Sequence, residues 1–315
     1  MSATQLDPEA AALLERAARS SRPNAHLLPV EDARRHYDEE CAAAETGQPV
    51  GAVSDFTIPV AGGEIPARLY RPCGEQLGAA VYLHGGGWIL GSIESHDATC
   101  RALVNASSAA IVSVGYRRAP EHRFPTAAED AYAACRHVVA NAAELRIDPE
   151  RIGVAGDSAG GNLAIAAALL ARERGEPRLA FALLAYPVTT TDLDAGFDPA
   201  YAGIVLERDE LLWHQENYFS AAEDRRSPLA SPLDRADLRG FPPTLILTAG
   251  CDPIHAQGEL FADALRRAEV EVKHDHHPGM MHGFLQFPTT LQEATRGITR
   301  AGAALSSRLA GAHVS

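Results

Sequence analysis

The chain has 315 residues, of which 46% are hydrophobic, and it carries a formal net charge of −13. This length and apolar content are sufficient for one large α/β domain with an additional segment. The negative charge argues against nucleic acid and anionic membrane surfaces as partners, because both repel an acidic protein. Lys273 is the only lysine, so a P-loop lysine, a Ser-x-x-Lys pair and a Schiff-base lysine are not expected.

The N-terminus and the cysteines indicate the cellular compartment. Residues 1–9 lack the basic start of a signal peptide, and no apolar run approaches the length needed to span a membrane. The five cysteines are widely spaced and form no C-x-x-C pair, which favours buried, reduced thiols over disulfides. We therefore expect a cytoplasmic protein.

The first part of the chain predicts two helices followed by a hairpin. Asp7 and Pro8 form a favourable helix start, with Asp as the N-cap residue, and a second helix is expected from about Pro29. Residues 56–60 and 65–70 alternate in polarity and predict a β-hairpin. Residues 1–45 thus precede every predicted strand.

From residue 79 onward, short apolar stretches alternate with helical ones, which predicts a mostly parallel sheet covered by helices on both faces. Strands are predicted at 79–83, 111–115, 151–155, 181–186, 244–248 and 270–274, and helices at 126–145, 254–268 and 291–309. Residues 189–220 interrupt this rhythm with acidic residues and a Leu-Leu-Trp cluster. We expect a helical cap segment over 1–45 and an α/β domain over 46–315, with a cap insertion at about 189–220.

A G-D-S-A-G motif at residues 156–160 lies between the predicted strand 151–155 and a helix. In a sharp strand-to-helix turn of this kind, the serine backbone is strained and its hydroxyl is exposed. The flanking glycines avoid steric clashes, and the helix N-terminus favours a developing oxyanion. The motif indicates a nucleophilic Ser158, with an ordinary glycine-rich turn as the alternative.

A second motif, H-G-G-G-W at residues 84–88, directly follows the predicted strand 79–83. Three successive glycines leave backbone N–H groups uncovered by side chains, which suits a cradle for an anion. A flexible linker is the alternative, but linkers seldom follow a buried strand and end in tryptophan. The motif therefore predicts an anion-binding loop.

A nucleophilic serine needs a base, and the base needs an orienting acid. In a parallel sheet, both are expected in loops after the carboxyl ends of later strands. Asp252 follows the predicted strand 244–248, and His282 follows the predicted strand 270–274, in the chain order Ser-Asp-His. Asp157 is too close to Ser158 in sequence to orient a distant imidazole, and we expect it to hold the turn.

Other histidines are rivals for these roles. The run His274-Asp275-His276-His277 lacks the spacing of helical metal ligands and is interpreted as a solvated strand end, not as a metal site. His84 and His122 precede the serine motif, and we expect each to brace a loop by hydrogen bonding.

The segments 84–88, 116–122, 156–161, 252–253 and 282–284 resemble those of the hormone-sensitive-lipase-like family of bacterial carboxylesterases. The resemblance spans residues 79–287 and implies an α/β-hydrolase fold with a helical cap. It also implies ester hydrolysis without a metal or an organic cofactor. The implied catalytic residues are Ser158 as the nucleophile, His282 as the general base and acid, and Asp252 as its orienting carboxylate. The implied oxyanion hole consists of the N–H of Ala159 and two of those of Gly85, Gly86 and Gly87.

The chain departs from the family at one place. Members commonly carry further acids after the Asp-Pro pair, where this chain has Ala256 and Gln257. Those acids would support Asp252 by hydrogen bonds, so the departure affects the expected surroundings of that carboxylate.

By this resemblance we expect a serine carboxylesterase acting on soluble esters with short to medium acyl chains. An arylformamidase or other amidase is an alternative, because arylformamidases share similar motifs, and a ligand-binding homologue without catalysis is another. The expected partner is a small-molecule ester, and a homodimer is compatible with the sequence.

Overall fold

The computed structural model describes residues 5–19, 23–74, 78–234 and 237–309. Within them, an eight-stranded sheet has the order β1-β2-β4-β3-β5-β6-β7-β8. The first two strands form the antiparallel edge of the sheet, and the other strands are parallel to one another. The strands are β1 (Ala52–Val60), β2 (Gly63–Arg71), β3 (Ala79–Leu83), β4 (Ala110–Val114), β5 (Ile152–Asp157), β6 (Ala182–Ala185), β7 (Thr244–Cys251) and β8 (Val272–Met281).

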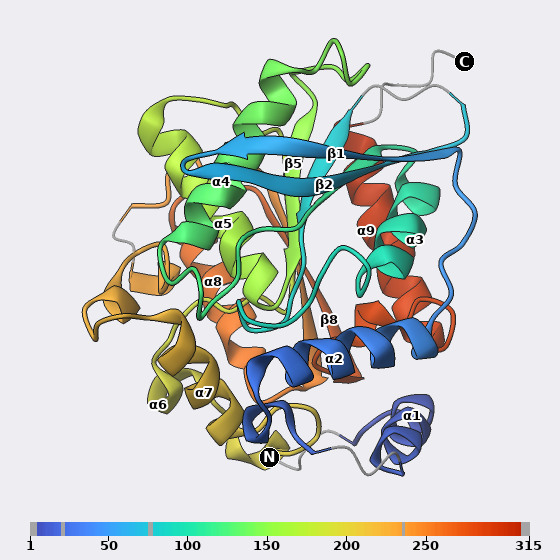
Figure 1. Cartoon of the computed structure of the whole chain (residues 1–315), viewed down its shortest axis with the longest axis vertical. Helices are drawn as coiled ribbons and strands as arrows, with labels where there is room; N and C mark the ends of the chain where they lie inside the picture. The colour runs from blue at the N-terminus through green and yellow to red at the C-terminus, as the bar shows by residue number, and fades with distance from the viewer. Residues whose placement is uncertain (1–4, 20–22, 75–77, 235–236, 310–315) are drawn as a thin grey trace.

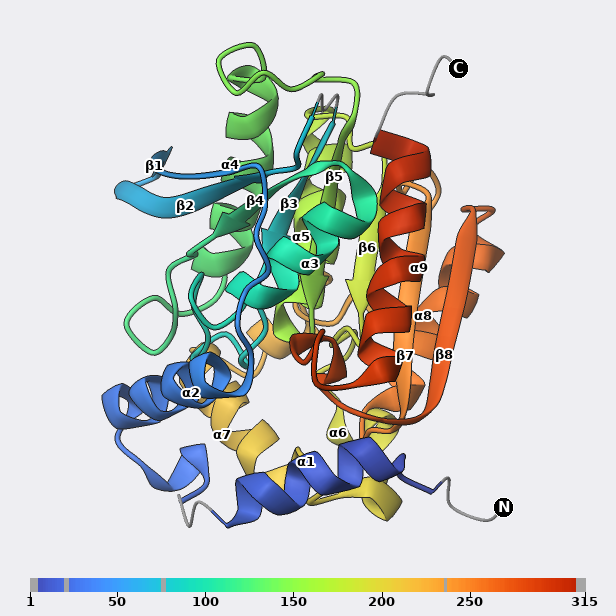
Figure 2. The same cartoon turned by 90° about the vertical axis from the view of Figure 1, so that its right-hand side faces the viewer.

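Helices cover both faces of the sheet. Figures 1 and 2 show α3 and α9 on one face, and α4, α5 and α8 on the other. The helices of the described residues are α1 (Pro8–Ala18), α2 (Val30–Ala44), α3 (Asp97–Ser107), α4 (Thr126–Ala140), α5 (Ala159–Arg174), α6 (Leu193–Gly196), α7 (Arg208–Tyr218), α8 (His255–Arg267) and α9 (Gln292–Leu309). The predicted fold class, a mostly parallel sheet between two helical layers, is confirmed.

The core explains why the central strands are apolar throughout. Every residue of β3, β4, β5, β6 and β7 is buried. Alternate residues of β3 enter different cores: Val81 and Leu83 pack with α4, α5 and α8, whereas Ala80 and Tyr82 pack with α3 and α9. Because both faces of the sheet are covered, neither set of side chains has to be polar.

The last strand differs from its prediction. β8 continues through the histidine run to Met281, so the expected solvated strand end at 274–277 is wrong. The reason is that β7 also extends further, to Cys251, and provides pairing partners for the polar residues. Thr248 Oγ1 lies 2.8 Å from His274 Nε2 and 2.9 Å from His276 Nδ1. Among the described residues, no group of three or more His, Cys, Asp or Glu side chains is placed to hold a metal ion.

The helix predicted at 126–145 and the cysteines predicted to be buried agree with the structure only in part. The helix predicted at 126–145 ends at Ala140 and is followed by turns. All five cysteines are free thiols, and Cys100, Cys135 and Cys251 are buried, whereas Cys73 is exposed. In the part of the chain that the structure describes, no helix is long and apolar enough to cross a membrane.

The segments expected to form a cap gather at one end of the sheet. Figure 2 shows α1, α2, α6 and α7 together at the end where the parallel strands terminate. We propose that residues 1–45 and the insertion at about 189–220 together form the cap of the α/β domain over 46–315.

Arg34 connects α2 to two loops of the α/β domain through hydrogen bonds and an ion pair. Its guanidinium donates to the carbonyl oxygens of Ile89 (2.9 Å) and Ala119 (2.7 Å), and it pairs with the Glu121 carboxylate at 2.7 Å. Ile89 directly follows the H-G-G-G-W motif, and Ala119 belongs to the 116–122 segment. One buried side chain thus connects the cap to two loops of the main domain.

Replacing Arg34 with alanine should lower the free energy of unfolding by about 2 kcal/mol, because buried acceptors lose their donor. Arg35→Ala is the matched control, since Arg35 is exposed and, in the part of the chain that the structure describes, its one ion pair is a surface pair with Asp32, which should contribute less than about 0.5 kcal/mol. Urea unfolding measures both. Equal losses in the two variants would contradict this role of Arg34.

Candidate active site

The serine motif forms the expected strand-to-helix turn. β5 ends at Asp157, α5 begins at Ala159, and Ser158 between them has φ 55° and ψ −122°. A positive φ is strained for a residue with a side chain. A Cβ at Gly160 would collide with the Leu83 carbonyl oxygen, and one at Gly156 would collide with the backbone of Gly160. The turn therefore packs directly against the end of β3, which is the steric reason for both glycines.

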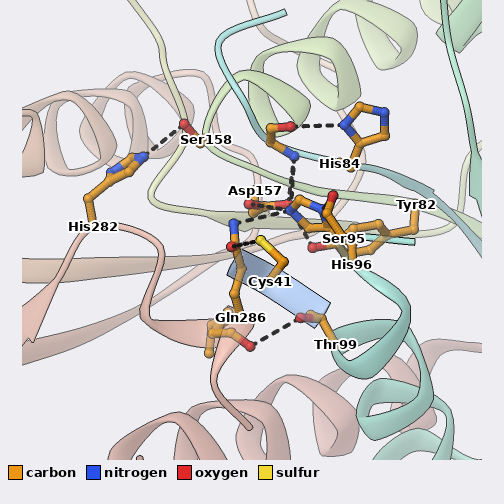
Figure 3. Close-up of polar contacts among 12 residues, drawn as sticks. Cys41, Tyr82, His84, Ser95, His96, Thr99, Asp157, Ser158, His282 and Gln286 are labelled. Carbon is orange, nitrogen blue, oxygen red and sulfur yellow. Dashed lines mark hydrogen bonds and ion pairs between the residues drawn. The ribbon is translucent and has the colours of Figure 1, made fainter. Parts of the chain in front are cut away.

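Three loops bring Ser158, His282 and Asp252 together. His282 Nε2 lies 2.8 Å from Ser158 Oγ, and His282 Nδ1 lies 2.7 Å from Asp252 Oδ2. Figure 3 shows the imidazole of His282 directed at Ser158. The Asp252 carboxylate is buried and also accepts from the N–H of Ile254 at 2.9 Å. An ionised carboxylate fixes the hydrogen on Nδ1, which leaves Nε2 free to accept the serine proton.

Asp275, the nearest rival carboxylate in sequence, has other partners. Its Oδ2 lies 2.7 Å from Arg300 Nε and 3.2 Å from His277 Nε2, on the side of the sheet covered by α9. His277 in turn pairs with Glu293 of α9 at 2.8 Å. Asp275 thus belongs to a separate polar cluster and does not contact His282.

The glycine loop after β3 consists of residues 84–88, and its backbone N–H groups differ in whether they already have an acceptor. The N–H of Gly85 donates to Asp157 Oδ1 at 3.0 Å, so it is not available to a reacting carbonyl. Gly86 and Gly87 adopt positive φ values of 113° and 60°. Among the described residues, no protein acceptor takes the N–H of Gly86, Gly87 or Ala159. We therefore propose that the oxyanion donors are the amides of Gly86, Gly87 and Ala159, without that of Gly85.

Asp157 is the centre of a buried network, which Figure 3 shows. Its carboxylate is 1% exposed and accepts from the Tyr82 hydroxyl at 2.7 Å, in addition to Gly85. His96 Nε2 lies 3.3 Å from Asp157 Oδ2. Burial alone would raise the pKa of Asp157, but the charge and hydrogen bond of His96, with the Tyr82 hydroxyl, lower this pKa to about 2. Asp157 thus holds the glycine loop as well as the turn.

The network continues from His96 to the cap. His96 Nδ1 lies 2.9 Å from Ser95 Oγ, and Gln286 Nε2 lies 3.2 Å from His96 Nε2. Gln286 Nε2 also donates to the Tyr37 hydroxyl of α2 at 3.0 Å. His96, Gln286 and Tyr82 were missed by the sequence analysis, because they lie in no motif and are far apart in the chain.

His84 and His122 have different surroundings. His84 Nδ1 donates to the Gly85 carbonyl at 2.9 Å, and its ring stacks on Tyr116 at 4.3 Å, so it braces the glycine loop as expected. Burial, then the charge of His96, lowers the pKa of His84 to about 3, which keeps the ring neutral. His122 is exposed, so the bracing role expected for it is not supported.

Gln257 is one of the two residues at which the chain departs from the family pattern, and it has hydrogen-bond partners of its own. Its side chain is buried, and Oε1 accepts from the N–H groups of Thr189 (2.8 Å) and Thr190 (3.2 Å). Its Nε2 donates to the Gly196 carbonyl at 3.2 Å. This residue therefore ties α8 to the start of the insertion, while Asp252 is supported by the backbone of its own loop.

A cavity of about 990 Å³ lies over Ser158 and His282. Its walls include both predicted cap segments together with the glycine loop. Leu13, Leu14, Leu28 and Tyr37 contribute from the N-terminal segment, and Leu193, Leu206 and Leu211 contribute from the insertion. The cavity supports the proposed cap, because both segments form walls above the serine.

Comparison with known proteins gives a consistent result. A family model described as an alpha/beta hydrolase fold matches residues 80–286. An ethyl acetate hydrolase of Pseudomonas putida is 39% identical over 295 residues, which cover 90% of this chain and 92% of the relative. The carboxylesterase NlhH of Mycobacterium tuberculosis is 41% identical over 253 residues, which cover 78% and 79%.

Solved structures agree over nearly the whole chain. A hyperthermophilic esterase from the archaeon Pyrobaculum calidifontis superimposes with a TM-score of 0.90 at 40% sequence identity. The match covers 96% of this chain and 98% of the esterase. A thermostable esterase from Pseudomonas putida has a TM-score of 0.91 at 32% identity.

The low pKa of Asp157 has a consequence for stability. A carboxyl whose pKa is lower in the folded protein stabilises the fold above its ordinary pKa, and this contribution is lost as the pH falls through the folded value. Asp157→Asn should therefore lower the free energy of unfolding by about 2 kcal/mol at pH 7, with the difference from wild type shrinking between about pH 4 and pH 2.

Urea unfolding at pH 7, pH 5 and pH 3 measures this difference. Asp209→Asn, at an exposed position of α7, is the control, and its small effect should not vary with pH. A difference between wild type and Asp157→Asn that stays constant down to pH 3 would contradict an ionised Asp157.

Proposed function

The chain belongs to the α/β-hydrolase fold family, and we therefore propose that it is a serine carboxylesterase for soluble esters with short to medium acyl chains. The observation that carries the proposal is the hydrogen-bonded series from Ser158 through His282 to Asp252 at the floor of the cavity. The relatives named above as an ethyl acetate hydrolase and a carboxylesterase support an ester as the substrate.

In the proposed first half-reaction, Ser158 Oγ attacks the ester carbonyl while His282 Nε2 accepts its proton. Asp252 keeps the other proton of the ring in place and stabilises the imidazolium that forms. The amides of Gly86, Gly87 and Ala159 are the proposed donors to the oxyanion, and a donor of this kind is typically worth about 3 kcal/mol. His282 then returns the proton to the departing alcohol, which leaves an acyl-serine.

The second half-reaction repeats these steps with water. His282 accepts a proton from water as the water oxygen attacks the acyl carbonyl, and the same amides face the oxyanion. Collapse of the intermediate breaks the bond to Ser158 Oγ, which takes the proton back from His282. The products are an alcohol and a carboxylic acid, which releases its proton to solvent as it ionises, and the proton transfers within both half-reactions pass through His282.

The proposed preference for small soluble esters is supported by the roofed cavity. Apolar side chains from the N-terminal segment and the insertion line the cavity together with Ser158, which suits an apolar acyl chain. Nothing in the geometry of the site favours amide cleavage, so the arylformamidase alternative gains no support.

Replacing Ser158 with alanine removes the attacking oxygen. We expect kcat/KM for p-nitrophenyl butyrate to fall by about 10³-fold or more, with little change in thermal unfolding. Ser307→Ala, at an exposed position of α9, is the control. An organophosphate should add one adduct at Ser158, measured by peptide mass spectrometry. Modification of another serine would show that the nucleophile is misassigned.

The choice of acid is tested by two matched substitutions. Asp252→Asn should lower kcat by about 10³-fold or more, because an amide cannot hold His282 in the tautomer that accepts the serine proton. Asp275→Asn should change kcat by less than about threefold, because Asp275 contacts His277 and Arg300 instead. Steady-state kinetics distinguishes the two, and the reverse pattern would identify Asp275 as the acid.

A further inference from the structure

The roof of the cavity contains two polar groups that the proposed mechanism does not use. Glu210 and His214 both belong to α7 and both line the cavity that holds Ser158 and His282. They are four residues apart, so they occupy the same face of the helix one turn apart. A helix of the insertion thus presents an acid and an imidazole to the space above the nucleophile.

His214 lies against the glycine loop, and one of its ring nitrogens has no hydrogen-bond partner among the described residues. Its side chain is 5% exposed, and within the described residues no group forms a hydrogen bond with its buried Nε2. A Cβ at Gly87 would overlap the imidazole ring, so the ring covers this glycine closely. Burial, then the charges of His26 and His282, lowers the pKa of His214 to about 3, and the ring is neutral. A buried polar atom normally has a partner, and because His214 lines the cavity, this nitrogen is available to a polar group of a bound ligand.

Glu210 gives the same part of the cavity a negative charge. Burial is the main cause that raises its pKa, to about 7; Glu207 raises this pKa further and the positive charge of His282 opposes it. At mildly alkaline pH the carboxylate is ionised in a partly dry site, where charges interact more strongly than in water. The other charged side chains that line the cavity are one arginine, Arg16, and the carboxylates of Glu39, Glu40, Asp157 and Glu207, so acidic groups outnumber the basic one.

We propose that Glu210 and His214 form a subsite in the roof that selects esters by charge. The subsite favours an ester that carries an ammonium group, whose N–H groups can donate to both side chains, and it disfavours an ester with a second, free carboxylate. This proposal rests on the proposed esterase function and specifies its substrate class. The same field acts on the carboxylate product and favours its release.

The test uses two series of esters matched in size, assayed at pH 8.5. The acyl series consists of p-nitrophenyl 6-aminohexanoate, heptanoate and hydrogen adipate, which are cationic, neutral and anionic. The alcohol series consists of choline butyrate and 3,3-dimethylbutyl butyrate, which differ only in charge. Choline has no N–H group, so this pair tests the negative charge of Glu210 without hydrogen bonding. Together the two series test either half of the ester against the roof.

Wild type should prefer the cation to its neutral isostere, and the neutral ester to the anion, in kcat/KM. Glu210→Gln should lower the ratio of cation to anion, or of choline to 3,3-dimethylbutyl ester, by about tenfold. His214→Phe keeps a ring over Gly87 but removes its nitrogens, and it should lower the preference for the ammonium ester by a smaller factor. Thermal unfolding confirms that each variant is folded.

Asp209→Asn is the matched control, because it removes the same charge from the exposed side of α7, outside the cavity. Its selectivity ratios should equal those of wild type. Ratios that Glu210→Gln leaves unchanged in both series would overturn the charge subsite. Failure of wild type to hydrolyse even p-nitrophenyl heptanoate would instead contradict the proposed esterase function, so the two failures are distinguishable.

Discussion

The buried carboxylate of Asp157 connects the segments on which the site depends. It accepts from Tyr82 of β3 and from Gly85 of the glycine loop, and it lies beside His96 before α3. Its own backbone directly precedes Ser158. A carboxylate that is ionised in a dry interior is costly unless donors surround it, so these donors are held to it. The nucleophile and the loop that faces it are thereby fixed relative to each other before any substrate arrives.

Further hydrogen bonds connect the residues around Asp157 to the two segments of the proposed cap. Gln286 lies between His96 and Tyr37 of α2, and Gln257 holds the first residues of the insertion. Arg34 joins α2 to the segment after the glycine loop. The parts of the proposed cap are therefore anchored to the same loops that carry the reacting groups. A substitution in the proposed cap that shifted these hydrogen-bonded residues would therefore also change the position of Ser158.

The sequence predicted the fold class, and it predicted that Ser158, Asp252 and His282 each follow a strand of the same sheet. Parallel strands end at a common edge of the sheet, so residues that follow different strands meet there. What the sequence could not predict depends on contacts across the chain. His274 and His276 looked like a strand end because their pairing with Thr248 is not local.

The glycine loop illustrates the same limit. Three consecutive amides looked equivalent in the sequence, and only the contact with Asp157 removed Gly85 from the set. Glu210 and His214 lie in an insertion whose placement over the site follows from tertiary packing. No local pattern marked them as neighbours of the nucleophile.

The kinetics of Asp157→Asn test most directly whether this carboxylate fixes the glycine loop. The asparagine has the same shape but no charge, and because one oxygen is replaced by an NH2 group, it can no longer accept hydrogen bonds at both positions. If Asp157 positions Gly86 and Gly87 through Gly85, kcat for p-nitrophenyl butyrate should fall by about tenfold or more while KM changes by less than about twofold. An unchanged kcat, or a loss confined to KM, would contradict the account.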